Sequence, residues 1–245
     1  MAKITIVTDL HVGAGNGIKE SIPDLVENIE EEYSDFVFVL GDVIHDTGEV
    51  ETDRNNLRYV VDQFDSLDKT VYFLAGNHDA NVVNRRTFEH IVGNQVNTIA
   101  HLGDEYIAMI DSAFGRKYPN TAYLGKDAID TLEHAMPFDP TPIVLSHFPI
   151  TYTDKYQRSD WFSEYPEGVF PVDKKRIDDL EVKPNISIHG HMHLNDRLVW
   201  YNNGIRSCAV RPYTQFEEID NPVCTEWYLT LDTDLLQNMY GDENE

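Results

Sequence analysis

The sequence predicts an α/β fold, a layered αββα sandwich of two mixed β-sheets with helices on the outer faces. Short apolar runs rich in β-branched residues predict buried strands, and between them apolar residues recur every three or four positions, as on an amphipathic helix. Alternation of strands with helices is typical of a layered core that contains a parallel stretch of sheet. The strands near the end of the chain are expected to form the second sheet.

In the first third of the chain, three apolar strands alternate with two helices. The strands are expected at residues 4–8, 36–40 and 70–75. The first helix follows a capping-box pattern at Ser21 and Asp24, and its apolar face extends to Tyr33. The second helix carries an apolar face from Leu57 to Leu67. Because each helix has one apolar face, both are expected to cover the sheet.

The rest of the chain continues this alternation. Helices are expected at 82–92, 126–136 and 173–180, and strands at 96–100, 105–111, 143–146, 185–188, 197–200, 205–209 and 226–231. Residues 151–172 are rich in aromatic side chains but show no regular period, which favours a loop or a small cap inserted into the domain. We therefore expect a single domain over residues 1–232, followed by an acidic, disordered tail at 233–245.

The composition is that of a globular protein without a membrane anchor. Of the 245 residues, 41% are hydrophobic. No apolar run approaches the roughly 18 to 20 residues that cross a bilayer, and the run at 4–7 is too short for the core of a signal peptide. The two cysteines, Cys208 and Cys224, lack metal-binding spacing and are expected to be reduced. These features predict a cytoplasmic protein with no membrane partner.

The chain is strongly acidic, with 43 acidic residues against 19 basic residues and a net charge of -24. Such a chain repels polyanions at long range, which argues against the binding of long nucleic acids. A solvated acidic surface also keeps a protein soluble. The composition gives no indication of the oligomeric state.

Potential metal ligands directly follow five of the predicted strands. They are Asp9 and His11, Asp42, Asn77 with His78, His147, and His191 with His193. A single histidine at a strand end is usually structural. In α/β sheets, however, ligands bind at the carboxyl ends of the strands, where residues far apart in sequence converge. The complete set, at the ends of what we take to be one sheet, therefore predicts a metal site.

These segments carry the motifs DxH, GD, GNHD, a lone His and GHxH, in that order, between residues 9 and 193. The ordered set resembles the calcineurin-like metallophosphoesterase family, whose pattern is DxH, GD, GNH[DE], H and GHxH. The resemblance implies a metallophosphoesterase domain that binds two divalent metal ions. It also implies the ligands: Asp9, His11 and His193 for the first ion, Asn77, His147 and His191 for the second, and Asp42 as the bridge.

The chemistry of phosphoester hydrolysis explains these residue types. Two divalent ions about 3.5 to 4 Å apart can clamp a phosphoester and activate a shared water, so that a metal-bridging hydroxide attacks phosphorus. The resemblance further implies that His78 is a general acid that protonates the leaving oxygen, and that Asp79 orients it. The ligand set lacks thiolates, which suits Mn, Fe or Zn, and we favour Mn.

A looser match concerns the substrate. The segments Asp111-Ser112 and Tyr123-Leu124-Gly125 resemble the branch of the family that contains cyclic-nucleotide phosphodiesterases. The expected activity is therefore hydrolysis of a small or nucleotide-like phosphodiester. The candidate substrate contacts are Asn77, His78, His45, Arg116 and Arg158. The alternatives are a phosphomonoesterase acting on protein or metabolite, a DNA nuclease, and a non-catalytic protein-binding scaffold like the relatives in the retromer branch.

Overall fold

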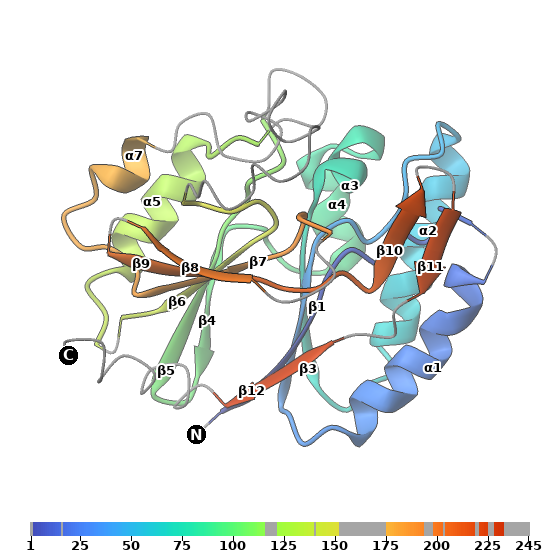
Figure 1. The fold of residues 1–245 in the computed structure, drawn as a ribbon, viewed down its shortest axis with the longest axis horizontal. Coiled ribbons are helices and arrows are strands. Elements are labelled where there is room, and N and C mark those ends of the chain that lie inside the picture. The colour runs from blue at the N-terminus through green and yellow to red at the C-terminus, as the bar shows by residue number, and fades with distance from the viewer. Residues whose placement is uncertain are drawn as a thin grey trace.

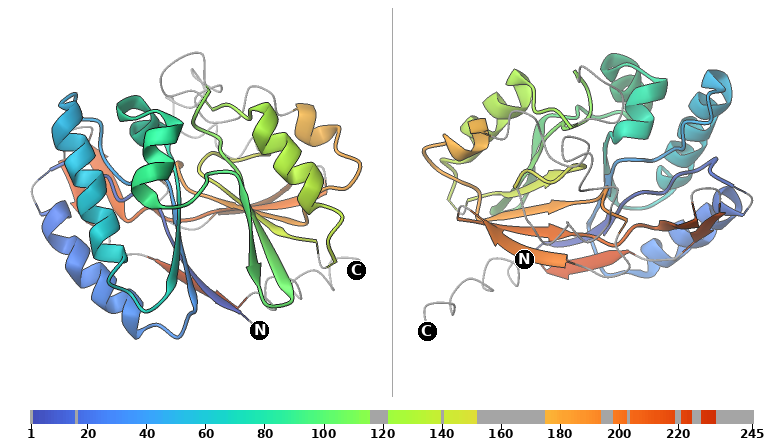
Figure 2. Two further views of the ribbon diagram at one scale, coloured as in Figure 1. Left: turned by 180° about the vertical axis from the view of Figure 1, so that it is seen from behind. Right: turned by 45° about the horizontal axis from the view of Figure 1, so that its top comes forward.

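The computed structural model describes residues 2–15, 17–115, 122–139, 141–151, 175–193, 198–202, 204–218, 221–224 and 228–232. Within these ranges the chain forms two mixed β-sheets that pack against each other, with helices on the outer face of each (Figures 1 and 2). The predicted layered α/β sandwich is confirmed.

The first sheet has the strand order β12-β1-β2-β3. Its strands are β1 (Lys3–Val7), β2 (Phe36–Leu40), β3 (Thr70–Leu74) and β12 (Leu229–Asp232). The strands β1, β2 and β3 run parallel, and β12 runs antiparallel to β1. The strand predicted at 226–231 therefore lies in the first sheet and not in the second, because it pairs with the edge of β1.

The second sheet has the order β4-β5-β6-β7-β9-β8. Its strands are β4 (Thr98–Leu102), β5 (Glu105–Met109), β6 (Ile143–Ser146), β7 (Ile186–His189), β8 (Leu198–Asn202) and β9 (Ile205–Ala209). The four strands β5, β6, β7 and β9 run parallel, and the outer strands are antiparallel to them. A separate hairpin of β10 (Thr214–Glu218) and β11 (Asn221–Cys224), which the sequence patterns did not predict, follows the second sheet in the chain.

Helices α1 (Ile18–Glu31) and α2 (Val50–Phe64) cover the first sheet, whereas α5 (Lys126–Ala135) and α7 (Lys175–Asp178) cover the second (Figure 1). The helix predicted at 82–92 corresponds to α4 (Arg85–Val92), which begins later than predicted because the side chain of Asn84 caps it. A short helix that was not predicted, α3 (Asn77–Val82), precedes it. The prediction for α1 was also wrong at both ends. The helix begins before Ser21, and Tyr33 lies beyond its end with 84% of its surface exposed.

Side chains along the second sheet alternate between two buried layers. Ile107, Met109 and Leu145 face the core between the sheets, whereas Ala108 and Val144 pack toward α5. Since successive side chains of a strand point to opposite faces, this alternation fixes the register of β5 against β6. The register in turn fixes where each strand ends, and the candidate ligands follow those ends.

Among the helices that the structure describes, none is long and apolar enough to cross a membrane. The cap predicted at 151–172, apart from Thr151, and the tail predicted at 233–245 lie outside the described residues.

Candidate metal centre

The segments that carry the predicted ligands meet between the two sheets. β1, β2 and β3 of the first sheet, and β6 and β7 of the second, lead into them. The prediction that all five strands belong to one sheet was therefore wrong. The segments converge because the parallel strands of both sheets present their carboxyl ends to the same region of the sandwich, as the distances between side chains show.

The first cluster contains Asp9, His11, Asp42 and His193, each of which offers a ligand atom within 4.8 Å of the others. The Nε2 atoms of His11 and His193 are 3.0 Å apart. His193 Nε2 lies 3.3 Å from Asp9 Oδ1, and His11 Nε2 lies 3.7 Å from Asp42 Oδ2. Two imidazoles and two carboxylates thus point at one small volume.

The second cluster contains Asp42, His147 and His191, whose ligand atoms again lie within 4.8 Å of one another. His147 Nε2 is 3.3 Å from Asp42 Oδ2 and 3.2 Å from Asn77 Oδ1. The other ring nitrogen, Nδ1, is 2.8 Å from the carbonyl of Leu40 and donates to it. This bond directs Nε2 of His147 into the cluster. Asp42 belongs to both clusters.

The backbone at these ligands is strained. Non-glycine residues with positive φ are uncommon, because their Cβ crowds the backbone. The described part of the chain contains five non-glycine residues with positive φ, and all five are predicted ligands. Their φ angles are 56° at Asp9, 48° at His11, 47° at Asp42, 67° at His191 and 43° at His193. Strain of this kind persists where the surrounding structure holds it, and it gathers at functional sites.

Two glycines of the motifs lie so close to these ligands that a side chain at either position would clash with them. A Cβ on Gly76 would lie 2.1 Å from Asp42 Oδ1, and a Cβ on Gly190 would lie 1.9 Å from Thr8 Oγ1 and 2.6 Å from Asp9 Oδ2. Side chains at these positions would displace both carboxylates. The glycines of the GNHD and GHxH motifs therefore set the positions of Asp42 and Asp9.

The two carboxylates are ionised although both are fully buried. Burial opposes the charge of Asp42, but His147 and His78 hold its pKa well below its usual range. Burial likewise opposes the charge of Asp9, but the nearby His193 lowers the pKa of Asp9 below its usual value. No lysine or arginine forms an ion pair with either carboxylate in the part of the chain that the structure describes. Among the described residues, imidazoles are the only cationic groups that pair with the two buried carboxylates.

The imidazoles divide into two electrostatic classes. Burial lowers the pKa of His191 to about 3 and that of His11 well below its usual value, so both rings are neutral and have a nitrogen able to bind a cation. Burial alone would also lower the pKa of His147, but the carboxylate of Asp42 raises it to about 9. Buried carboxylates, neutral imidazoles and an amide oxygen are the donors that divalent Mn, Fe and Zn accept. The residues present therefore fit a pair of divalent ions.

His78 lies beside the clusters and is held by Asp46. Its Nδ1 donates to Asp46 Oδ1 over 2.5 Å, and its backbone N–H donates to Asp42 Oδ1 over 2.8 Å. Burial alone would lower the pKa of His78, but Asp42 and the bonded Asp46 raise it to about 9. The ring remains 22% exposed, so that a substrate can reach it.

Asp79 does not orient His78 as predicted. Its Oδ2 accepts from the backbone N–H groups of Gly76 at 2.8 Å and Val43 at 3.2 Å, and its Oδ1 accepts from Ile44 at 3.1 Å. The side chain is fully buried. Asp79 therefore joins the turn after β3 to the turn after β2, and the contact to the His78 ring belongs to Asp46.

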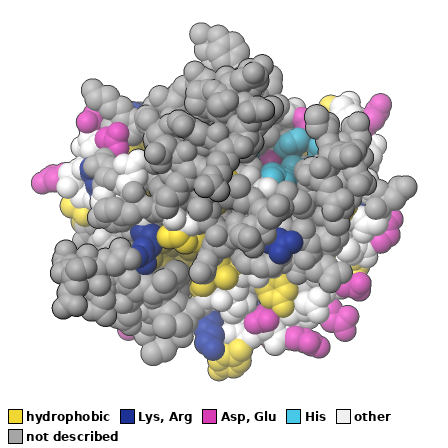
Figure 3. Space-filling view, in the orientation of Figure 1, with side chains coloured by type: hydrophobic (Ala, Val, Ile, Leu, Met, Phe, Trp, Pro, Cys, Tyr) yellow, Lys and Arg dark blue, Asp and Glu magenta, His cyan; other side chains and the backbone are white. Residues whose placement is uncertain are grey.

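Of the other predicted substrate contacts, His45 lies at the centre. Its ring stacks on His78 with the centroids 4.9 Å apart and lies 5.6 Å from the ring of His11. In the space-filling view, histidine side chains gather at one place on the surface beside an acidic side chain (Figure 3). Arg116 and Arg158, the remaining predicted contacts, lie outside the described residues.

Comparison with known proteins identifies the fold family. A model of the calcineurin-like phosphoesterase family matches residues 2–195, more than half of the chain. The chain belongs to the calcineurin-like phosphoesterase family. No curated protein has a sequence that matches this phosphoesterase.

Solved structures with similar folds include two phosphatases. A dimetal phosphatase from Danio rerio matches with a TM-score of 0.63 at 11% identity, over 86% of this phosphoesterase and 87% of that chain. A purple acid phosphatase from yellow lupin (Lupinus luteus) matches with a TM-score of 0.59 at 14% identity, over 85% of this chain and 43% of that one. The protein TT1561 from Thermus thermophilus matches with a TM-score of 0.54 at 8% identity, over 94% of this chain and 98% of that one.

Family membership makes the chain a metal-dependent phosphoester hydrolase, and the family implies two divalent ions. Two residues around the centre of this phosphoesterase were missed in the sequence. Asp46 follows Asp42 by four residues, and Thr8 donates through Oγ1 to Asp9 Oδ2 over 2.7 Å. Their proximity to the GD and DxH motifs was the available signal, but sequence alone does not show which neighbouring carboxylate reaches an imidazole.

Proposed function

We propose that this phosphoesterase hydrolyses a small or nucleotide-like phosphodiester in the cytoplasm, with Mn as the favoured metal. The observation that carries the proposal is that the two clusters share Asp42. A carboxylate is the side chain that can bridge two cations, and two cations a few ångströms apart are the arrangement that clamps a phosphoryl group.

The ligands proposed for the two ions follow the two clusters. They are Asp9, His11 and His193 for the first ion, Asn77, His147 and His191 for the second, and Asp42 between them. When bound, two divalent ions supply Lewis acidity that stabilises charge on the phosphoryl oxygens and makes a water acidic. The buried carboxylates and the strained turns hold the donors in place beforehand, so that little rearrangement accompanies binding.

His78 is proposed as the general acid of the reaction. Its Nδ1 is committed to Asp46, which leaves Nε2 as the atom that can donate a proton to the leaving oxygen. The adjacent ring of His45 and the amide of Asn77 are proposed to contact the oxygens of the substrate. Asp46 fixes the orientation of His78, as carboxylates commonly do for functional imidazoles.

The charge around the centre supports a diester over a monoester. A diester carries one negative charge at neutral pH, whereas a monoester carries nearly two. In the described part of the chain, the carboxylates Asp9, Asp42 and Asp46 form ion pairs with imidazoles and with no lysine or arginine. The large negative net charge of -24 adds further repulsion to a dianion.

A phosphomonoesterase is the second candidate. The neighbours from zebrafish and lupin carry the names dimetal phosphatase and purple acid phosphatase, although they share only the fold at 11% and 14% identity.

Hydrolysis of matched model substrates separates the two candidates. With added Mn²⁺, kcat/KM for bis(4-nitrophenyl) phosphate is expected to exceed that for 4-nitrophenyl phosphate by about tenfold or more, which corresponds to about 1.4 kcal/mol in the transition state. A panel of cyclic and linear nucleotides and a plasmid DNA then tests the substrate class. A preference for the monoester, or cleavage of plasmid in preference to nucleotides, would assign the second candidate or a nuclease. Absence of hydrolysis by protein loaded with two ions would favour a scaffold.

Replacing Asp46 with asparagine is expected to lower kcat about tenfold for a diester with an alkoxide leaving group, because His78 loses the carboxylate that orients it. For a nitrophenolate leaving group, which hardly needs a proton, the loss should stay below about twofold. Rates on both substrates measure the effect, and Asp62→Asn on the exposed face of α2 is the matched control. Equal losses on the two substrates would contradict the role given to Asp46.

A further inference from the structure

The turn that carries Asp9 and His11 is held from two sides. On one side its N–H groups are bonded to the turn after β2: Asp9 N donates to Gly41 O over 3.0 Å, and His11 N donates to Asp42 O over 2.9 Å. The positive φ angles of Asp9 and His11 are thereby tied to the segment of the bridging carboxylate. The carbonyl groups of the turn need partners of their own, because buried carbonyl groups are rarely unpaired.

Two consecutive residues far along the chain supply those partners. Tyr213 N donates to Thr8 O over 2.9 Å, and Thr214 N donates to Asp9 O over 3.0 Å. The hydroxyl of Thr214 donates to Leu10 O over 2.7 Å. Three successive carbonyls around the DxH motif are therefore bonded by Tyr213 and Thr214, and the carbonyl between the two ligands receives the side-chain bond.

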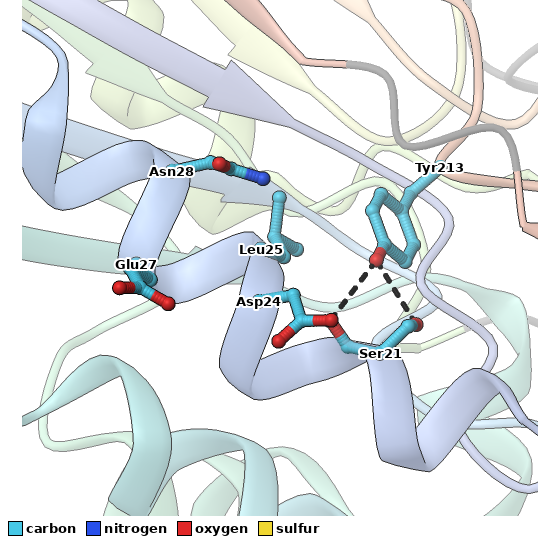
Figure 4. Close-up of a pocket in the computed structure, with 6 residues that line it drawn as sticks. All are labelled: Ser21, Asp24, Leu25, Glu27, Asn28 and Tyr213. Atoms are coloured by element: carbon cyan, nitrogen blue, oxygen red, sulfur yellow. Dashed lines mark hydrogen bonds between the residues drawn. The ribbon is translucent and has the colours of Figure 1, made fainter.

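Tyr213 is itself hydrogen-bonded to a helix. The hydroxyl of Tyr213 donates to Ser21 in α1, 3.0 Å from its Oγ and 3.3 Å from its carbonyl (Figure 4). Tyr213 is 1% exposed, and Thr214 is fully buried. The close-up shows the ring of Tyr213 directed at the helix, so that the segment before β10 is fixed against both α1 and the DxH turn (Figure 4).

We propose that Tyr213 and Thr214 are positioning residues for the metal centre, holding the backbone of Asp9 and His11 in its strained conformation. The inference rests on the ligands assigned under the proposed function. Both residues lie beyond residue 195, where the match to the family model ends. The side-chain hydroxyl of Thr214 is the part of this arrangement that a substitution can remove without changing the shape of the side chain.

Binding of Mn²⁺ to metal-free protein, followed by the electron paramagnetic resonance of free Mn²⁺, tests the inference without using catalysis. Thr214→Val keeps the shape of the side chain but loses the donor, and it is expected to weaken binding of at least one Mn²⁺ about tenfold, as loss of an outer-shell bond does. Thr214→Ser keeps the donor and should stay within about twofold of the natural protein. If Thr214→Val does not fold, Thr214→Ala, which also lacks the donor, takes its place, with the same direction of change expected.

The control is Thr5→Val in the same strand that leads to Asp9. Thr5 is fully buried, and its hydroxyl bonds Ser34 at 2.8 Å and Thr230 at 3.2 Å, away from the DxH turn. It should lower thermal stability in EDTA but leave Mn²⁺ affinity unchanged. Natural affinity in Thr214→Val, or an equal loss in Thr5→Val, would overturn the inference.

These outcomes are distinct from failure of the proposed function. If the protein binds two Mn²⁺ with the expected loss in Thr214→Val, but hydrolyses no phosphodiester, the positioning role stands and the proposed function falls. If the natural protein binds no Mn²⁺, both fall.

Discussion

Replacing Asp42 with asparagine is expected to remove one of two bound divalent ions and to lower kcat/KM by at least about 10³-fold, or about 4 kcal/mol. Asp42 Oδ2 faces both clusters, 3.7 Å from His11 Nε2 and 3.3 Å from His147 Nε2. Asparagine offers one neutral oxygen in place of two charged ones. It therefore cannot bridge two cations, and it leaves the neighbouring imidazoles without their counter-charge.

Metal content by mass spectrometry and kcat/KM on the same preparation measure this effect. The matched control is Asp53→Asn in α2, since Asp53 is also a fully buried carboxylate but its Oδ1 accepts from Thr47 over 2.7 Å and it belongs to neither cluster. Asp53→Asn should retain two ions. Two ions retained by Asp42→Asn would show that the bridge is assigned to the wrong residue.

Replacing His78 with alanine is expected to reduce turnover by roughly 10² to 10⁴-fold for a phosphodiester with an alkoxide leaving group, the range found for general acids. For a nitrophenolate ester the reduction should be much smaller, because that leaving group departs without a proton. Metal content should not change. His78 groups with His11 and His45, a set that contains no carboxylate, and it belongs to neither of the two clusters that share Asp42.

The ratio of the two losses decides the role of His78. His101→Ala is the control, because His101 is an exposed histidine on β4 whose ring contacts Tyr106 and not the metal centre. It should leave both rates unchanged. Equal losses on both esters in His78→Ala would remove the role of leaving-group acid, and loss of an ion would indicate a ligand instead.

Asp46 and Asp79 show where prediction from sequence ends. Both are acidic residues within or beside one of the five motifs, and Asp79 is adjacent to His78 in sequence. In the structure the carboxylate of Asp79 accepts hydrogen bonds from three backbone N–H groups, whereas Asp46, in the turn after β2, accepts the hydrogen bond from the ring of His78. Adjacency along a chain does not determine which side chain faces which, because the backbone of a tight turn sends neighbours in different directions.

The strands show the same contrast between what is local in the sequence and what depends on distant contacts. The apolar runs predicted the strands that carry the site, because burial of a continuous β-branched run is a local property. Assignment of those strands to sheets was wrong for the site and for β12, because pairing depends on contacts between residues far apart in sequence. The hairpin β10–β11 was missed for a different reason, since its strands lack a strong apolar pattern.

The sequence by itself determined the reaction class of this protein, because five short motifs in a fixed order supply oxygen and nitrogen donors and resemble the motifs of the calcineurin-like metallophosphoesterases, which implies two clusters of ligands. Only the tertiary structure decided that the donors come from two sheets, that Asp46 bonds to the ring of His78, and that Tyr213 and Thr214 donate hydrogen bonds to the DxH turn. The physical reason is that donor type is encoded locally, whereas the position of a donor is set by packing and by hydrogen bonds between distant segments.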